Sequence, residues 1–209
     1  MRKLSVTVDI VLFTIRDRQL QLLLIKRLVK PFQNRYALPG GFVREDESLD
    51  AAAVRELREE TGIDKVYLEQ LYTFGDPKRD PRGRVITVAY YALVPHTQSL
   101  RAGTDASDAA WFPVTGYPPL AFDHRRIVDY AHLRVRNKLD YTNVGFELLP
   151  PKFTLTELQL VHEAILGENL DKRNFRRKIT QKGIVKPTGE WVQTGRKPPQ
   201  LYRFSNAVR

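Results

Sequence analysis

Apolar runs rich in β-branched residues are separated by polar turns over the first two thirds of the chain. Residues 4–15 and 20–27 predict two strands joined by a turn at 16–19, and an apolar residue at every fourth position over 49–61 predicts a helix. The further predicted elements are an extended segment at 36–41, strands at 65–74, 85–94 and around Trp111–Phe112, and a helix over 123–139. Strands and helices alternate without a regular βαβ rhythm, which indicates an α/β fold with a mixed sheet.

The pattern changes after Pro150–Pro151, where two prolines stop regular structure. A capping box, Thr154 to Glu157, predicts the start of a helix that ends at Gly167, and a second, basic helix follows from Asp171 to Gly183. Two strands, 184–192 and 200–204, are then separated by a basic turn at 194–199. This order is typical of a winged helix-turn-helix, so we predict one domain over 1–149 and a second over 150–209.

The 209 residues suffice for one large or two modest domains, and an apolar fraction of 42% is ordinary for a globular chain. No apolar run approaches the roughly 18 residues of a membrane span, and no small-residue cleavage site follows the first apolar stretch, which Asp9 interrupts. The chain has no cysteine, which excludes disulfides and thiolate metal sites. We expect a cytoplasmic protein with no membrane partner.

The formal net charge of +10 is concentrated in the last quarter of the chain. Residues 152–209 contain twelve Lys and Arg against five Asp and Glu, so they supply seven of the ten net positive charges. A local excess of this kind indicates a polyanionic partner, while a merely soluble basic surface is the alternative.

Three glutamates in the predicted helix 49–61 lie on one face. Glu56, Glu59 and Glu60 are spaced i, i+3 and i+4, where like charges repel at a cost of about 0.2–0.5 kcal/mol per pair. A hard cation such as Mg²⁺ or Mn²⁺, bound together with substrate phosphates, would offset this repulsion. The alternative is a solvated helix face relieved by Arg55 and Arg58.

The residues around these glutamates reproduce a known motif. Gly41, Glu47 and the run Arg55–Ile63 (RELREETGI) match every fixed position of the Nudix box, so this segment resembles the Nudix hydrolase family. The resemblance implies an αβα sandwich that hydrolyses nucleoside diphosphates linked to another group. It further implies Glu56 and Glu60 as principal metal ligands, Glu59 as an additional ligand or base, a backbone carbonyl ligand from Gly40, and supporting catalytic roles for Arg55 and Glu47.

A basic loop follows the box. In DPKRDPRGR, the guanidinium groups of Arg79, Arg82 and Arg84 are candidates for substrate binding, because Arg matches phosphate oxygens in geometry. A solvated charged loop is an equally good interpretation. Asp123 is the expected cap of the next helix, and His124 is a weaker candidate for a phosphate contact.

The second basic helix has the composition of a recognition helix. Leu170, Phe175 and Ile179 can face inward, while basic and amide side chains cover the remaining surface for contacts to phosphates and base edges. A solvated basic helix is the alternative. The predicted DNA-binding residues are Lys172, Arg173, Asn174, Arg176, Arg177 and Lys178 on the helix, and Arg196 and Lys197 at the wing tip.

Nearly the whole chain resembles the Nudix-related transcriptional regulators of NAD metabolism, through the box together with FTLTELQLVHEAILG, LDKRNFRRKI and QLYRF. The resemblance implies ADP-ribose as ligand, a double-stranded DNA operator, a homodimer, and repression of NAD-biosynthesis genes. Because every fixed position of the Nudix box agrees with the family's motif, we expect hydrolysis with Mg²⁺ or Mn²⁺ to be retained. Two alternatives stay open: a plain nucleotide pyrophosphatase whose tail serves dimerisation, and a non-catalytic repressor that senses a sugar or nucleotide.

Overall fold

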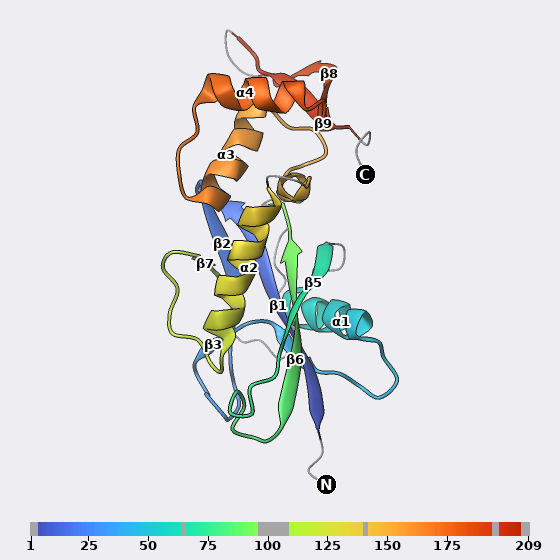
Figure 1. The fold of residues 1–209 in the computed structure, drawn as a ribbon, viewed down its shortest axis with the longest axis vertical. Helices are drawn as coiled ribbons and strands as arrows, with labels where there is room; N and C mark the ends of the chain where they lie inside the picture. The colour runs from blue at the N-terminus through green and yellow to red at the C-terminus, as the bar shows by residue number, and fades with distance from the viewer. Residues whose placement is uncertain (1–3, 64–65, 96–108, 140–141, 194–196, 206–209) are drawn as a thin grey trace.

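The structure is a computed structural model, and it describes residues 4–63, 66–95, 109–139, 142–193 and 197–205 (Figure 1). A seven-stranded mixed sheet is built around β1 (Ser5–Arg16), which is antiparallel to β2 (Gln19–Lys26) and parallel to β6 (Val85–Leu93). The other strands are β3 (Tyr36–Ala37) and β7 (Ala109–Pro113) beside β2, β4 (Gly40–Phe42) beside β1, and β5 (Tyr67–Phe74) beside β6. The predicted α/β class with a mixed sheet is confirmed.

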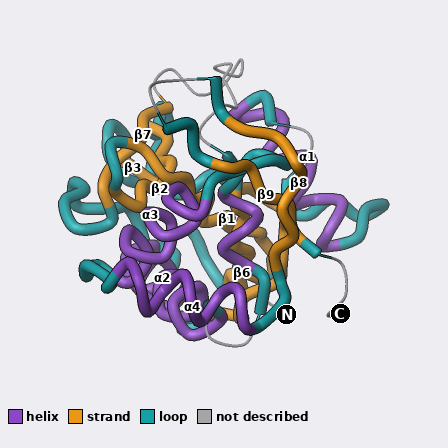
Figure 2. Tube along the Cα trace, turned by 90° about the horizontal axis from the view of Figure 1, so that it is seen from above, coloured by secondary structure: helices purple, strands orange, loops and turns teal. Residues whose placement is uncertain are grey.

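Two helices cover opposite faces of this sheet, which makes three layers. The view from above shows α1 (Leu49–Thr61) and α2 (His124–Lys138) on either side of the strands (Figure 2). Side chains of β1 alternate between the two faces. Val8, Ile10 and Leu12 belong to the apolar cluster under α1, whereas Val11 and Phe13 belong to the cluster under α2.

Helix α1 begins and ends at the residues predicted from the sequence, and capping interactions define both of its ends. The Ser48 side chain accepts a hydrogen bond from Ala51 N, and the helix ends at Gly62 in the left-handed conformation at φ +72°. The start of α2 differs from the expectation. Asp123 occupies the N-cap position, but its side chain makes no capping hydrogen bond, because both carboxylate oxygens are engaged by Arg79.

The C-terminal unit has the predicted winged-helix order. Its elements are the short 3₁₀ helix η1 (Val144–Leu148), α3 (Leu155–Leu166), α4 (Lys172–Gln181), β8 (Val185–Trp191) and β9 (Gln200–Phe204). The capping box of Thr154 and Glu157 is confirmed, with both of its hydrogen bonds present. One continuous apolar cluster runs from the sheet through α2 and η1 into α3 and α4. The winged helix therefore packs directly on the sheet domain at the far end of α2 (Figure 1).

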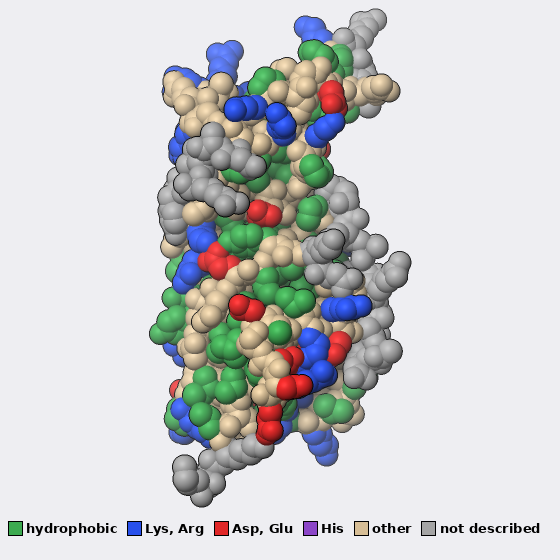
Figure 3. Space-filling model, turned by 90° about the vertical axis from the view of Figure 1, so that its right-hand side faces the viewer, with side chains coloured by type: hydrophobic (Ala, Val, Ile, Leu, Met, Phe, Trp, Pro, Cys, Tyr) green, Lys and Arg blue, Asp and Glu red, His purple; other side chains and the backbone are tan. Residues whose placement is uncertain are grey.

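No helix among the described residues has the length and apolar character needed to cross a membrane. On the face shown in Figure 3, Lys and Arg side chains gather over the winged-helix end, while acidic and basic side chains are mixed towards the other end.

Candidate functional site

Arg55 holds the acidic face of α1 together. Its Nε and Nη2 donate to the two carboxylate oxygens of Glu47 at 2.9 and 2.6 Å, and its Nη1 donates to Glu56 at 2.7 Å and to Glu59 at 3.1 Å. These hydrogen bonds hold the pKa of Glu47 well below its usual range, at about 2. One guanidinium therefore offsets part of the repulsion between the glutamates, but the face is not the fully solvated one of the alternative interpretation, because Glu56 is buried.

Glu60 is held differently from the other box carboxylates. Its Oε2 accepts a hydrogen bond from Gly40 N at 2.8 Å. Burial raises the pKa of Glu60 to about 8, and the nearby carboxylates of Glu56 and Asp9 raise it further. Burial also raises the pKa of Glu56, against the opposing effect of Arg55. The charged forms of the buried Glu56 and the half-buried Glu60 are thus both disfavoured, and a cation beside them would favour their ionisation.

The two glycines of β4 make room for this arrangement. A Cβ atom on Gly41 would lie 2.3 Å from Glu56 Oε1, and one on Gly40, at φ +153°, would lie 2.2 Å from the carbonyl oxygen of Val8. Neither approach is possible for a larger residue without moving a carboxylate or a backbone strand. The box glycine is therefore required by the close packing of the Glu56 carboxylate on β4.

The donors of the box suit Mg²⁺ or Mn²⁺, since carboxylate and carbonyl oxygens are the hard ligands that these ions prefer. Within the described parts of the chain, however, no three Asp, Glu or His side chains are already gathered around a common point. Glu59 is exposed and directed to Arg55 and Arg44. The residue chemistry fits a divalent ion, whereas the ligand set of Gly40, Glu56, Glu59 and Glu60 stays a prediction.

A cavity of about 570 Å³ opens beside Glu60, between β1, β2, β4 and the start of α2. At its base Arg79, only 3% exposed, donates to Asp9 at 3.2 Å and to both oxygens of Asp123 at 2.8 and 3.1 Å. The buried His124 accepts from Leu38 N through Nδ1, and its Nε2 lies 3.5 Å from Asp9. Because Nδ1 accepts this bond, it carries no proton, and the proton of the neutral ring is assigned to Nε2; burial lowers the pKa of His124, which favours the neutral form.

The three arginines predicted to bind substrate separate in the structure. Arg79 and Arg82 line the cavity, whereas Arg84 does not line it and instead donates to the carbonyl oxygen of Gly75 at 2.7 Å. Arg82 pairs with Asp80 through Nε and Nη2, and its guanidinium lies over an aromatic ring of the cavity wall, 5.0 Å from the Phe42 centroid.

Sequence reasoning missed several residues of this cavity. Arg27 lines it, with its guanidinium 4.8 Å from the centroid of Phe122, and Thr7, Asp9 and Phe42 line it as well. Asp9 did carry a signal, because it is a charged residue within an otherwise apolar strand. Arg27, at the end of the second strand, carried none.

The predicted DNA-binding residues of α4 divide between its faces. Phe175 and Ile179 are buried, while Lys172, Arg173 and Arg177 are exposed. Arg177 donates to the Asn174 side chain at 3.0 Å. The partly buried Arg176 instead reaches back to the Thr156 hydroxyl on α3 at 3.3 Å. Asp171 caps the helix by accepting from Asn174 N.

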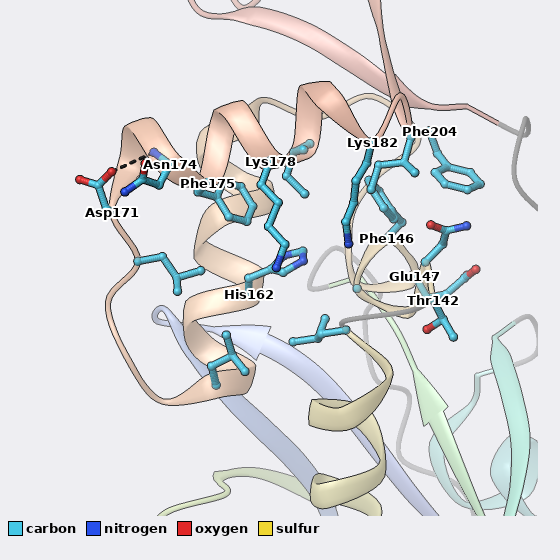
Figure 4. A pocket seen from close by; sticks show the side chains of 17 residues that line it. Thr142, Phe146, Glu147, His162, Asp171, Asn174, Phe175, Lys178, Lys182 and Phe204 are labelled. Atoms are coloured by element: carbon cyan, nitrogen blue, oxygen red, sulfur yellow. Dashed lines mark hydrogen bonds between the residues drawn. The ribbon is translucent and has the colours of Figure 1, made fainter.

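Lys178 is also exposed, but it lies on a different side of α4 from Arg173 and Arg177. A cavity of about 790 Å³ is enclosed by η1, α3 and α4 below the recognition helix, and Figure 4 shows Lys178 and Lys182 directed into it, towards His162 and Phe146. At the wing, Lys197 is exposed, and Arg196 lies outside the described residues. The exposed residues of α4 among those predicted to bind DNA are thus Lys172, Arg173, Asn174, Arg177 and Lys178, and their contact with DNA stays a prediction.

Comparisons with known proteins match both units. A family model described as the NUDIX domain matches residues 3–131, and one described as the NrtR DNA-binding winged helix domain matches residues 145–204. A protein of Acinetobacter baylyi named as an ADPR-responsive transcriptional repressor is 43% identical over 203 residues, which cover 95% of this chain and 81% of the relative.

A second relative matches a shorter part of the chain. An ADP-ribose pyrophosphatase of Methanocaldococcus jannaschii is 43% identical over 115 residues, which cover 54% of this chain and 68% of the relative. The crystal structure of Shewanella oneidensis NrtR in complex with a 27mer DNA superposes with a TM-score of 0.85 at 39% identity, covering 96% of this chain and 93% of that one. The chain therefore belongs to the Nudix family and, over nearly its whole length, to the NrtR-type repressors that join a Nudix domain to a DNA-binding winged helix.

Proposed function

We propose that this protein is an ADP-ribose-responsive transcriptional repressor that binds ADP-ribose in the Nudix cavity and operator DNA through α4. The observation that carries the proposal is the presence, in one packed chain, of a carboxylate box beside an arginine-lined cavity and of an exposed basic recognition helix. The A. baylyi relative is named for the same response, and the S. oneidensis structure contains DNA.

Hydrolysis of ADP-ribose is the second part of the proposal. Glu56, Glu60, Glu59 and the Gly40 carbonyl would hold Mg²⁺ or Mn²⁺. When bound, such an ion neutralises a pyrophosphate and lowers the pKa of a coordinated water. The chain's own contribution is positional. Arg55, fixed by both oxygens of Glu47, orients Glu56 and Glu59, and Gly40 N orients Glu60.

The response is proposed to act through a homodimer in the cytoplasm. An operator read by two recognition helices requires a set spacing between them, and a ligand that alters the dimer changes this spacing. The fold supplies a connection between the two sites. α2 begins at the cavity, where Asp123 pairs with Arg79, and packs on α3 towards the winged helix.

The test is a titration of the full-length protein, bound to a labelled fragment carrying its own upstream region, with ADP-ribose, followed by fluorescence anisotropy at fixed salt. We expect operator affinity to fall as ADP-ribose saturates the protein. Operator affinity that stays constant at saturating ADP-ribose would contradict the switch, and absence of sequence-selective, salt-sensitive binding would favour a plain pyrophosphatase.

A non-catalytic sensor is the second candidate, favoured by one observation: Arg55 already engages Glu56 and Glu59, so the carboxylates are not gathered for an ion. Product analysis after incubation with ADP-ribose and Mg²⁺ distinguishes a catalytic repressor from a non-catalytic sensor. We expect AMP and ribose 5-phosphate from the wild type and at least a hundredfold less, roughly, from Glu60→Gln, because a metal ligand supplies several kcal/mol of transition-state stabilisation. Equal turnover in the variant would remove Glu60 from the mechanism.

A further inference from the structure

The turn that leads into the recognition helix is held by side chains of the helix before it. It runs from Gly167, which ends α3 in the left-handed conformation at φ +73°, to Asp171, which caps α4. Within the turn, Leu170 N donates to Glu163 Oε1 at 2.9 Å, and the Leu170 carbonyl oxygen accepts from Gln159 Nε2 at 2.9 Å. Both backbone polar groups of the residue before the cap are therefore bound to α3.

The two side chains that hold Leu170 are also bound to each other. Gln159 and Glu163 are spaced i, i+4 on one face of α3, and Gln159 Nε2 donates to Glu163 Oε1 at 2.9 Å. The Leu170 N–H and the Gln159 amide, which both donate to this carboxylate, hold the pKa of Glu163 below its usual range. We call the Gln159 and Glu163 side chains with the Leu170 backbone the turn clamp.

The turn clamp adds direction to the packing of α4. Asp171, next to Leu170, accepts from Asn174 N at 2.8 Å, so two consecutive residues fix the start of the helix. Further along α4, Phe175 and Ile179 are buried in the apolar cluster that α3 shares. Apolar burial has no preferred direction, whereas a hydrogen bond restricts both distance and angle. The turn clamp therefore restricts the direction in which α4 leaves the turn more than the apolar packing does.

The turn clamp is placed towards the sheet domain. Helix α3 lies between α4 and the sheet (Figure 1), and Glu163 lines a cavity of about 500 Å³ together with Arg18 and Leu20 of the sheet domain. The positive charge of Arg18 lowers the pKa of Glu163 further. A carboxylate is also unsuited to contact DNA phosphates, since like charges repel. Any effect of Glu163 on DNA binding therefore acts through the position of α4.

We propose that Gln159 and Glu163 are positioning residues of the recognition helix, which bind the Leu170 backbone and so hold α4 at the angle at which its side chains reach the base edges of the operator. Contacts to phosphates carry no sequence information, whereas base contacts depend on the exact placement of each side chain. Loss of the turn clamp therefore lowers selectivity for the operator more than affinity for DNA in general. This inference rests on the proposed function and adds to it residues that determine selectivity without touching DNA.

The test measures binding of the full-length protein to two labelled fragments of equal length by fluorescence anisotropy at fixed salt. One fragment carries the protein's own upstream region, and the other an unrelated sequence. We expect Glu163→Ala and Gln159→Ala each to weaken binding to the upstream fragment about tenfold, because each removes two hydrogen bonds, and to change binding to the unrelated fragment less than about twofold.

Two further variants separate geometry from charge. Glu163→Gln keeps an oxygen that can accept both hydrogen bonds, so its affinity for the upstream fragment should stay within about threefold of the wild type. Glu168→Ala removes the same charge at an exposed position of the turn and is the matched control. With less repulsion of DNA, it should bind both fragments as well as the wild type or more tightly.

Unchanged preference for the upstream fragment in both Glu163→Ala and Gln159→Ala would overturn the inference. An equal loss in Glu168→Ala, or a loss in Glu163→Gln as large as in Glu163→Ala, would overturn it as well. Melting temperatures identify a variant that fails to fold, and if Glu163→Ala does so, Gln159→Ala decides. A wild type without preference for the upstream fragment contradicts the proposed function and this inference together, whereas a selective wild type with equally selective variants contradicts this inference alone.

Discussion

The ligand cavity and the recognition helix both concentrate charged residues, but they hold them in opposite ways. In the cavity, Arg79 is almost completely buried and forms ion pairs with both Asp9 and Asp123. Each of these three charged groups therefore has a partner within the protein. On α4, Arg173 and Arg177 are exposed, and Arg177 donates to the neutral side-chain amide of Asn174.

This difference follows from the solvent around each region. Charges in a cavity of low dielectric must be paired, and a ligand has to fit groups that are already oriented. Exposed charges on a helix are held by water and ions, and DNA displaces those ions, so affinity depends on salt. The cavity is therefore suited to select one small ligand, and the helix to bind a polyanion and then read its bases.

The largest effect is expected on the exposed side. Replacing both Arg173 and Arg177 with Ala should weaken operator binding by at least about a hundredfold, because each side chain contributes 1–3 kcal/mol when it contacts a base. Lys178→Ala is the matched control. Its side chain is directed into the cavity below α4, so we expect less than a threefold change, roughly. Anisotropy at fixed salt measures both, and an equal loss in Lys178→Ala would show that the helix presents a different face to DNA.

An intermediate effect is expected in the box. Arg55→Lys should lower metal-dependent hydrolysis about 10- to 100-fold, because an ammonium group cannot hold both oxygens of Glu47 while also orienting Glu56 and Glu59. Arg44→Lys, at an exposed arginine 3.5 Å from Glu59, should change the rate less than about twofold. Operator binding without ligand should be the same in both variants. Its loss in Arg55→Lys would mean that the substitution unfolds the domain.

The smallest effect concerns the stability of the metal-free protein. The pKa of Glu60 is about 8 in the folded state and 4.5 in an unperturbed carboxyl, so the folded state binds this proton more tightly. Stability from this group is complete below about pH 4.5 and is lost as pH rises through about 8. The wild type should therefore lose at least about 3 °C in melting temperature relative to Glu60→Gln between pH 5 and 8. Parallel curves for the two proteins would contradict the burial of Glu60.

Much of the site could be predicted because its signals are local. Arg55, Glu56 and Glu59 come together because they lie within about one turn of one helix, whereas Gly41 reaches Glu56 only because β4 pairs with β1 beside that helix. The capping box at Thr154 and the cap at Asp171 likewise act within four residues. Asp123 shows where local reasoning fails. It was predicted to cap its helix, but Arg79, which is distant in the sequence, binds both of its carboxylate oxygens instead.

The sequence by itself determined the two units, the acidic helix face and the concentration of positive charge on α4, since these depend on neighbours along the chain and on composition. Only the tertiary structure decided that Arg79 and Arg82 line the cavity while Arg84 does not, and that Lys178 is directed into the cavity below the recognition helix. The physical reason is that a side chain's surroundings are set by the strands and helices that pack against it, and those partners are far away in the sequence.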